Sequence, residues 1–265
     1  MNTETRCFAV ISRGDPISEV KRELAIRTLE RAGFVYQAEE PEIILAIGGD
    51  GTVLQAFHTY KHRLELSGFI AYNTGHLGFY SDWDDLDALL QAIIEGHLIT
   101  VSYPLVEVHV HSHEGQTSFL ALNDFTIKGV KGSVQINVCL NQHLFESFKG
   151  DGLCVSSPSG STGYNKSLGG AIVHPSLEMI QLSEMASINN RVYRTIGSSL
   201  VIPKHHVLKL MPERDSYIYT VDHESYFTDT IQEVRCNVAK EKIQFYRCRT
   251  FPFWNRVKEA FISTD

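Results

Sequence analysis

The residues with the clearest chemical potential are Gly48-Gly49-Asp50-Gly51-Thr52, where one carboxylate stands among three glycines. The apolar run 43–47 before them predicts a buried strand, and the run 53–58 after them predicts the start of a helix. A strand that turns into a helix through glycines presents unpaired N–H groups and the positive end of a helix dipole at one point. A phosphate can approach such a backbone closely. The pattern therefore predicts a phosphate site.

The chemistry of that site depends on Asp50. A carboxylate would repel a phosphate unless it accepts a proton from an attacking hydroxyl or holds Mg²⁺. The dinucleotide pattern G-x-G-x-x-G and the P-loop pattern G-x-x-x-x-G-K-[ST] are both absent. We therefore interpret Asp50 as a base for phosphoryl transfer. The alternative, on these residues alone, is a tight strand-to-helix turn in which Asp50 caps the helix.

Two further glycine-rich runs have the composition of ligand loops. Residues 150–170, GDGLCVSSPSGSTGYNKSLGG, set short hydroxyl donors on a permissive backbone. Such donors suit a sugar–phosphate or a purine edge, and Tyr164 has a ring on which a base can stack. A long solvated loop is the alternative. Residues 73–79, NTGHLGF, follow a predicted strand. Ligands of open α/β sheets bind beyond the carboxyl ends of strands, so this loop and the Asp50 turn are expected to face one crevice.

Alternating strand and helix patterns over the first hundred residues must position the Asp50 turn. Strands are predicted at 7–11, 43–47 and 69–72, with a helix at 52–61. The spacing of Ile17, Val20 and Leu24 indicates another helix that ends near Gly33. This alternation predicts a parallel α/β sheet.

A further helix is predicted from an apolar stripe between residues 86 and 94. Its start is favoured by Asp82, Asp84 and Asp85, because acidic side chains stabilise a helix N-terminus, and its end by Gly96.

After about residue 100 the apolar pattern changes to a period of two. Residues 106–110 and 134–140 alternate apolar with polar side chains, which predicts strands with one buried face. Further β-like runs stand at 199–202, 207–211, 217–221, 231–238 and 242–247. We therefore predict an α/β domain over 1–100 and an antiparallel β-rich domain over 101–248. The spacing of Trp254, Val257 and Phe261 predicts a terminal helix, and the tail 249–265 is expected to pack back on the first domain.

Composition narrows the class of protein. The 265 residues are 43% hydrophobic and 21% charged, as is usual for a globular protein, and a net charge of −7 argues against non-specific nucleic-acid binding. No run of about 18 apolar residues predicts a membrane helix, and no secretory signal is visible. The cysteines form no C-x-x-C pair and are odd in number, five in all. Reduced thiols in the cytoplasm are therefore expected.

Taken together, the motifs of this chain resemble those of the NAD kinase family, most closely the short bacterial members. The match in order and spacing extends from about residue 42 to residue 223. Its motifs are GGDGT at 48–52, NTGHLGF at 73–79, LND at 122–124, GDG at 150–152, SPSGSTGYNKSLGG at 157–170 and MASINNR at 185–191.

The resemblance implies a fold and a reaction. The fold is that of NAD kinases and diacylglycerol kinases, an α/β domain followed by a β-rich domain that binds NAD. The phosphate donor is ATP or inorganic polyphosphate, with Mg²⁺ or another divalent metal, and the acceptor is the 2′-hydroxyl of the adenosine ribose of NAD. The product is NADP. The resemblance also implies homo-oligomers, dimers or tetramers, with NAD bound near a subunit interface.

The resemblance also assigns residues. Asp50 is the implied proton acceptor and Gly51 a close backbone contact, whereas Asn123 and Asp124 take the positions of an Asn-Glu pair that contacts the dinucleotide. Ser159 falls near the adenine. The remaining positions implied to bind NAD are Lys149, Asp151, Thr162, Gly163, Tyr164, Asn165, Lys166, Ser167 and Ala186.

Three of these positions depart from the usual family pattern. Asp124 is one methylene shorter than glutamate, so its hydroxyl contact needs a water or a shifted backbone. Lys149 stands where arginine is usual and cannot make a two-pronged contact. Gly163 replaces the commoner alanine and loosens the loop without removing a polar group.

Two other functions fit parts of the pattern. A lipid or sphingoid kinase shares GGDGT, but the chain lacks a basic amphipathic segment for a membrane surface. A non-catalytic NAD(P) sensor would keep the fold, but a pure binder gains nothing from a carboxylate beside phosphate.

Several histidines and one cysteine invite other interpretations. His109, His111 and His113 share a strand face, and we favour a solvated face over a metal site. His58 and His62 lack the glutamate of H-E-x-x-H and are expected at the surface. His223 stays a candidate phosphate contact. Cys154 lies in a β-like run and is expected to be buried.

Overall fold

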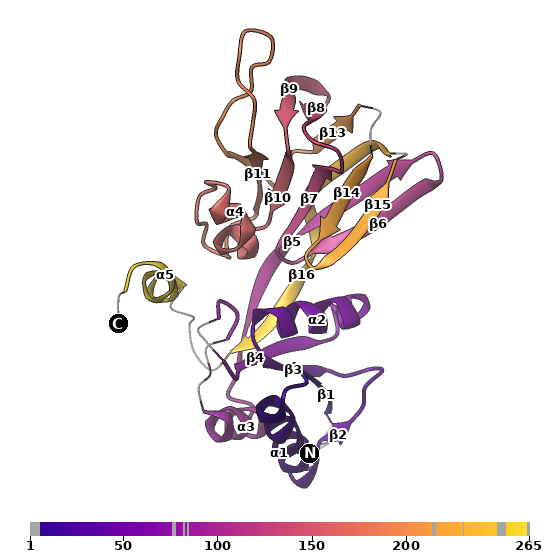
Figure 1. Cartoon of the computed structure of the whole chain (residues 1–265). Coiled ribbons are helices and arrows are strands. Elements are labelled where there is room, and N and C mark those ends of the chain that lie inside the picture. Colours follow the sequence, from indigo (N-terminus) through magenta and orange to yellow (C-terminus); the bar gives the residue numbers. More distant parts are fainter. Residues whose placement is uncertain are drawn as a thin grey trace. The chain divides into compact units, whose positions relative to one another are not determined.

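The computed structural model describes residues 6–75, 78–81, 83, 85–213, 216–229, 231–247 and 253–263. Four residues of the predictions, His76, Leu77, Asp82 and Asp84, lie outside the described residues, as does Cys248. The chain divides into two compact units (Figure 1). Unit 1 comprises Met1–Ser102 and Lys242–Asp265, and unit 2 comprises Tyr103–Glu241.

Unit 1 is built on a parallel sheet in the order β2-β1-β3-β4-β16. Helices and strands alternate along the chain, so the predicted parallel α/β sheet is confirmed. The strands are β1 (Cys7–Ser12), β2 (Val35–Tyr36), β3 (Ile43–Gly48), β4 (Gly68–Asn73) and the last residues of β16 (Ile231–Arg247). The helices are α1 (Pro16–Arg31), α2 (Asp50–Tyr60), the 3₁₀ turn η1 (Lys61–Arg63), α3 (Leu86–Glu95) and α5 (Phe253–Phe261).

The helix α1 forms as predicted, but its apolar stripe does not face the sheet. Ile17, Val20 and Leu24 are 60%, 69% and 45% exposed, whereas Ala25 and Leu29 are fully buried. The small Ala25 lets the helix approach the strands closely, and Leu29 fills the core beside it. Apolar spacing therefore located this helix but not its buried face.

The helix α3 agrees with its sequence signals in more detail. The Asp85 carboxylate accepts hydrogen bonds from the N–H groups of Asp87 and Ala88 and so caps the first turn. Gly96 ends the helix with φ of 70°, a left-handed conformation that glycine adopts without a Cβ clash.

Unit 2 is built from two antiparallel sheets. One has the order β12-β11-β10-β7-β14-β15, and in the other β16-β13-β8-β9 run side by side, with β5 pairing β16 and β6. One core cluster takes side chains from both sheets, including Val138, Val155 and Tyr219. The strands are β5 (Ile99–Ser112), β6 (Gly115–Ala121), β7 (Asp124–Gly129), β8 (Val134–Leu140), β9 (His143–Gly150), β10 (Gly152–Ser156), β11 (Met179–Met185), β12 (Leu200–Pro203), β13 (Leu208–Pro212), β14 (Tyr217–Val221) and β15 (Glu224–Thr228).

One strand prediction was wrong in detail. The runs 231–238 and 242–247 form the single strand β16 rather than two. The borders of the two units fall inside β5 and inside β16, which explains why the sequence shows a change of period there and no linker. No helix among the described residues is long and apolar enough to cross a membrane.

Candidate functional site

Asp50 opens α2 in unit 1, directly after the buried strand β3. The helix is capped by Gly49, without a side-chain hydrogen bond, so the interpretation of Asp50 as a cap is wrong. Instead, its carboxylate accepts hydrogen bonds from the backbone of the segment that follows β4. The Phe79 N–H lies 2.9 Å from Oδ2 and 3.1 Å from Oδ1, and the Tyr80 N–H lies 3.2 Å from Oδ1. Asp50 therefore links the glycine turn 48–52 to the end of the predicted ligand loop 73–79.

The environment of Asp50 favours proton uptake. Burial raises the pKa of its carboxyl group above the ordinary value, and the N–H groups of Phe79 and Tyr80 and the charge of Arg256 oppose that rise. A carboxylate offers about four lone-pair positions, so two N–H donors leave room for another donor. A raised pKa brings a carboxylate closer to the value that suits a general base near neutral pH.

The glycines around Asp50 are of two kinds. A Cβ on Gly48 would stand 2.0 Å from Thr52 Oγ1, and one on Gly78 would stand 2.6 Å from Asp50 Oδ1. These two glycines are required by packing within the protein. A Cβ on Gly49 or Gly51 would meet no atom of the described residues within 4 Å. The open space that a ligand needs therefore lies beside Gly49 and Gly51, as the close backbone contact implied for Gly51 requires.

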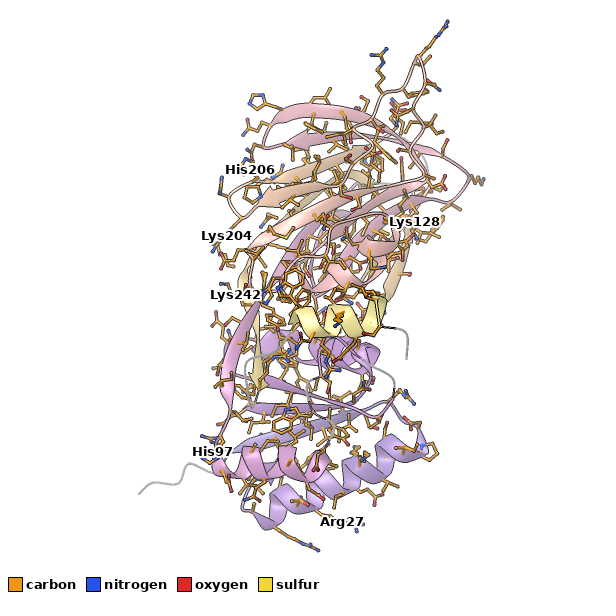
Figure 2. All side chains as sticks on the ribbon, turned by 90° about the vertical axis from the view of Figure 1, so that its left-hand side faces the viewer. Arg27, His97, Lys128, Lys204, His206 and Lys242 are labelled. Carbon is orange, nitrogen blue, oxygen red and sulfur yellow. The ribbon has the colours of Figure 1, made fainter. Side chains whose placement is uncertain are left out.

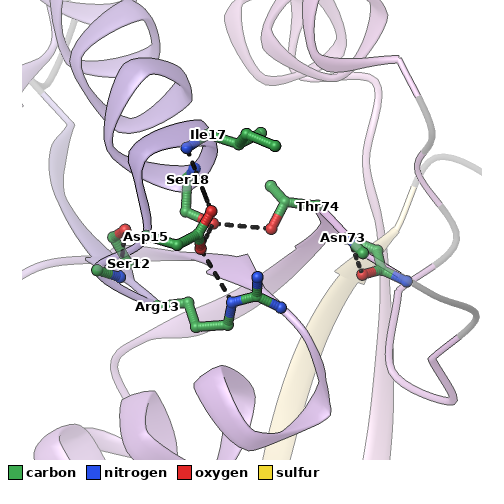
Figure 3. A network of polar contacts seen from close by, with 9 residues as sticks. Ser12, Arg13, Asp15, Ile17, Ser18, Asn73 and Thr74 are labelled. Carbon is green, nitrogen blue, oxygen red and sulfur yellow. Dashed lines mark hydrogen bonds and ion pairs between the residues drawn. The ribbon is translucent and has the colours of Figure 1, made fainter.

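A polar network at the carboxyl ends of β1 and β4 contains an arginine that the motifs did not single out (Figure 3). Arg13 Nε lies 2.9 Å from Asp15 Oδ2, and Ser18 Oγ contacts both Asp15 at 2.6 Å and Thr74 Oγ1 at 2.8 Å. These bonds, that of the Ser18 hydroxyl foremost, lower the pKa of Asp15 to about 2. Arg13 Nη1 stands 3.4 Å from where a Cβ on Gly75 would lie. The available signal was a basic residue placed directly after the first predicted strand.

In unit 2, the Leu122-Asn123-Asp124 segment is held by a second unpredicted residue, Asp222. Its Oδ1 accepts hydrogen bonds from the N–H groups of Asn123 at 2.7 Å and Asp124 at 3.1 Å, and its Oδ2 accepts one from Leu122 at 3.0 Å. The Asp222 N–H also donates to the Asp124 carbonyl at 2.8 Å. Nothing in the sequence marked Asp222 beyond its place beside His223.

Asp124 carries a buried carboxyl group that lacks a donor. Its residue is 8% exposed, and no hydrogen bond reaches the carboxylate from the described residues. Burial, and then the negative charge of Asp222, raise its pKa from 3.8 to about 7, against the opposing charge of Lys128. The Asp124 oxygens are not among the fully buried, unpartnered side-chain atoms of the described residues, so a water or a ligand can reach them and donate a hydrogen bond.

The first half of the serine-rich loop is packed and not solvated. Residues 156–161 are buried, and they run through the 3₁₀ turn η2 (Ser159–Thr162) into α4 (Tyr164–Ser167). The Ser161 hydroxyl bonds the backbone N–H of Val173 at 2.9 Å and its carbonyl at 3.2 Å. The alternative of a solvated loop is therefore wrong for residues 156–161.

Asn165, an implied NAD contact, is fully buried and bonded within the protein. Its Nδ2 lies 3.4 Å from the Ala171 carbonyl, and its Oδ1 accepts the Ser183 hydroxyl at 2.7 Å. A Cβ on Gly170 would stand 2.3 Å from the Asn165 side chain. In this structure Asn165 therefore braces the loop.

Other members of the loop present groups that the protein leaves available. Ser159 is 8% exposed, and its Oγ is buried without a hydrogen-bond partner in the described part of the chain. The Tyr164 ring is 39% exposed and lies 4.5 Å under the Lys128 ammonium. Thr162 is half-buried, with its hydroxyl 3.4 Å from the Ser159 carbonyl. Three more implied contacts are exposed: Gly163, Lys166 and Ser167.

The GDG motif packs against the end of β11. A Cβ on Gly150 would stand 2.8 Å from the Met185 carbonyl oxygen, and the Asp151 N–H donates to that oxygen at 2.9 Å. The Lys149 ammonium lies 5.8 Å from the centre of the Tyr193 ring. Ala186 is exposed and has φ of 46°, a strained conformation for a residue with a Cβ, and such strain is common at binding sites.

Most predicted site residues belong to unit 2, where the structure joins the 123–124 segment to the start of the serine-rich loop. Asp124 pairs with Ser156 across β7 and β10, and the Ser157 N–H donates to the Asn123 carbonyl at 2.8 Å. Asp50 and Gly51 belong to unit 1. A cavity of about 560 Å³ in unit 2 includes Ala186 in its lining but not Asp124 or Ser159, so this cavity does not coincide with the proposed ribose and adenine contacts.

The histidines that invited a metal interpretation have other neighbours. His109 Nδ1 lies 2.8 Å from Ser118 Oγ, and His113 Nδ1 lies 3.2 Å from Gln232 Nε2. No group of three or more His, Cys, Asp or Glu side chains in the described chain is arranged to hold a metal ion.

The remaining histidines and Cys154 lie as follows. His62 is exposed as predicted, whereas His58 is half-buried. His223 is exposed between β14 and β15. Cys154 is fully buried as predicted, and burial raises the pKa of its thiol well above the ordinary range.

Comparisons with known proteins extend over the whole chain. A family model described as the ATP-NAD kinase C-terminal domain matches residues 122–249. The chain is 48% identical over 264 residues to NAD kinase 1 of Oceanobacillus iheyensis, covering 97% of this chain and 99% of that protein. It is 50% identical over 260 residues to NAD kinase 1 of Halalkalibacterium halodurans, covering 96% and 98%. Its fold is similar to that of yeast NADH kinase complexed with NADH, with a TM-score of 0.85 at 15% identity, covering 100% of this chain and 90% of the yeast chain.

Proposed function

The chain belongs to the NAD kinase family, whose members make NADP from NAD and ATP, and on that premise we propose which of its residues carry the reaction. The observation that carries the assignment is the identity of 48–50% over nearly the full length of chain and relatives. The same identity argues against a lipid kinase. The division of roles among residues rests on the geometry of each unit.

Unit 1 supplies the groups for the phosphates of ATP. The N-terminus of α2, whose cap Gly49 makes no side-chain hydrogen bond, directs N–H groups toward the space beside Gly49 and Gly51, where an anion is stabilised. Arg13 follows β1 at the carboxyl edge of the same sheet, 52% exposed at its side chain, and adds a positive charge. Arg13 and the α2 N-terminus are therefore proposed to hold the phosphate chain.

Unit 2 supplies the groups for NAD. The buried carboxylate of Asp124 accepts a hydroxyl group of the ribose, and the unpartnered Ser159 hydroxyl bonds the adenine edge. The half-exposed Tyr164 ring offers a stacking face. Asn123, Thr162, Gly163 and Ala186 contribute through backbone position. The implied contacts at Lys149, Asp151, Lys166 and Ser167 stay proposals.

Asp50 is the proposed general base. As the 2′-oxygen of the adenosine ribose attacks the γ-phosphorus of ATP, the new O–P bond forms and the bond to the β,γ-bridging oxygen breaks. ADP leaves with that bridging oxygen. The 2′-hydroxyl proton moves to Asp50, whose raised pKa favours the transfer. Positioning and charge neutralisation supply the rest of the rate.

Magnesium enters this proposal as part of the substrate MgATP. The described residues contain no cluster of three metal-binding side chains, so they do not fit a resident metal ion. An Mg²⁺ ion held by substrate phosphates needs only one or two protein carboxylates. No step above depends on a protein-bound metal.

We also propose a homo-oligomeric, cytoplasmic enzyme. The segment after β11 exposes Ile188, Val192 and Ile196 at 37%, 80% and 43%, and a second copy of the chain is a suitable cover for them. The cysteines among the described residues are free thiols, as is usual in a reducing compartment.

The test of the function is formation of NADP. Purified protein is incubated with NAD and MgATP, and NADP is read out with an NADP-linked dehydrogenase. Replacing ATP by polyphosphate, and NAD by diacylglycerol, decides the donor and excludes a lipid acceptor. We expect NADP only with NAD and a phosphate donor. Tight NAD binding without any NADP would indicate a sensor and contradict the proposal.

A further inference from the structure

We propose that Asp222, in the turn between β14 and β15, is a positioning residue for NAD: it fixes the Leu122-Asn123-Asp124 backbone and places a negative charge beside the Asp124 carboxyl group. The inference rests on the proposed function, in which Asp124 accepts a ribose hydroxyl. Asp222 itself touches the protein and not the reacting atoms.

The backbone geometry shows what Asp222 is built to do. One carboxylate accepts hydrogen bonds from three consecutive N–H groups, at 2.7–3.1 Å. Asp222 pairs back through its own N–H to the Asp124 carbonyl. These four bonds fix the position from which Asp124 enters β7. Hydrogen bonds to a charged acceptor are about twice as strong as neutral ones, so the segment is held firmly.

The conformation of Asp222 supports the same role. Its φ is 54°, in the left-handed region where glycine would be unstrained. Aspartate tolerates this region better than most residues, but it is still less favourable there than glycine. Glycine would leave three N–H groups without their acceptor. The three hydrogen bonds to the Asp222 side chain therefore compensate for its unfavourable backbone conformation.

The charge of Asp222 acts on Asp124 as well. The groups that face the Asp124 carboxyl are Asp222, Lys128 from its own strand β7, and the buried Cys154 thiol of β10. Asp222 raises the pKa of Asp124 and Lys128 lowers it, with burial the largest cause of the rise. A ribose hydroxyl donates best to the ionised form of Asp124. NAD binding should therefore weaken as pH falls through the pKa of Asp124.

The first experiment is the pH dependence of the KM for NAD in the wild-type enzyme, from pH 5.5 to 8.5. We expect the KM to rise toward acid pH, with a midpoint near 7, while the KM for ATP follows a different curve. A KM for NAD that is flat between pH 6 and 8 would overturn the proposal without any mutant.

The second experiment compares three variants with the wild type. Asp222→Asn keeps the side-chain shape, loses the charge and replaces one acceptor by a donor facing Leu122. We expect the KM for NAD to rise about tenfold at pH 8, with kcat changed less than threefold. The pH midpoint of the KM for NAD should move to lower pH, because the charge that raises the pKa of Asp124 is lost. Asp222→Glu keeps the charge and displaces the carboxylate, so it should raise the KM without moving the midpoint. Asp229→Asn, an exposed residue after β15, is the charge-matched control and should match the wild type.

The outcomes separate this inference from the proposed function. If the wild type makes no NADP, the proposed function fails. If the wild type is active and Asp222→Asn shares its KM and midpoint, only the role of Asp222 fails. A third outcome would also overturn the inference. If both Asp222 variants lose kcat and thermal stability, and neither shifts the pH midpoint of the KM for NAD, Asp222 has only a structural role.

Discussion

The glycine turn of unit 1 and the serine-rich loop of unit 2 have similar compositions but treat their polar groups differently. In the turn, no atom of the described residues lies within 4 Å of where a Cβ on Gly49 or Gly51 would stand, and one carboxylate is the proposed base. In the loop, the side chains of Ser161 and Asn165 form hydrogen bonds within the protein, whereas the Ser159 hydroxyl has no partner among the described residues. The difference teaches that the number of polar residues does not locate a ligand. Buried groups that the fold leaves unsatisfied are the better guide.

The largest effect is expected at Asp50. Asp50→Asn should lower kcat by about 10²–10⁴ while the KM for NAD changes little, because the amide cannot accept the hydroxyl proton. Steady-state kinetics with NAD and MgATP provide the measurement. Thermal unfolding serves as the control, since the amide Oδ1 can still accept the N–H groups of the 79–80 segment. Undiminished turnover would remove Asp50 from the mechanism.

Asp124 should make stability depend on pH. Its folded pKa of about 7 lies above the ordinary 3.8, so the folded chain binds more protons between these values and the free energy of unfolding falls as pH rises through that window. Removing the charge with Asp124→Asn should therefore stabilise the protein at pH 8 relative to pH 5, by a few kcal/mol at most. Denaturant titrations at both pH values measure this. If Asp124→Asn changed the free energy of unfolding equally at pH 5 and pH 8, the raised pKa of the buried Asp124 carboxyl group would be contradicted.

Two serines of one turn offer a matched pair. Ser161→Ala should destabilise the protein by about 1–3 kcal/mol, because the Val173 backbone loses its partner. Ser159→Ala should leave stability unchanged or slightly higher and raise the KM for NAD several-fold, since its Oγ has no hydrogen-bond partner among the described residues. Unfolding curves and kinetics on both variants provide the comparison. If Ser159→Ala lowered stability and Ser161→Ala raised the KM for NAD instead, Ser161 would contact the ligand and Ser159 would stabilise the fold.

The smallest effect concerns the phosphates. Arg13→Ala should raise the KM for ATP about five- to tenfold and leave the KM for NAD nearly unchanged, because a partly exposed charge contributes about 1 kcal/mol. Arg27→Ala is the control, since Arg27 (labelled in Figure 2) lies on α1 with its side chain 69% exposed and pairs with Glu23 on the same helix. If both variants bind ATP alike, Arg13 is not a phosphate contact.

The alternation of elements, and with it the fold class, could be predicted because apolar periodicity and capping residues act locally. Asp85 and Gly96 mark the ends of α3 in sequence and in structure. Which face of a helix is buried depends on partners far along the chain, so the exposure of Ile17 and Val20 could not be foreseen. The joining of two β-like runs into β16 likewise depends on pairing partners.

The residues of the candidate site also fall into two groups, those that the sequence indicated and those that only the structure shows. The glycine turn marked Asp50 directly, because a carboxylate is unusual in that setting, whereas Asp124 and Ser159 were implied by the resemblance to the NAD kinase family. The motifs could not reveal Asp222, which meets the 122–124 segment across about a hundred residues of chain. Nor could they show that Asn165 is used internally, since hydrogen-bond partners are set by the tertiary fold.

The most direct test of the proposed mechanism is a crystal structure of the enzyme with NAD and a non-hydrolysable ATP analogue. We predict an Asp50 carboxylate oxygen at about 2.6–3.2 Å from the 2′-oxygen of the adenosine ribose, opposite the γ-phosphate. A carboxylate that bonds only the Phe79 and Tyr80 N–H groups, with the 2′-oxygen beyond reach even through one water molecule, would contradict the account.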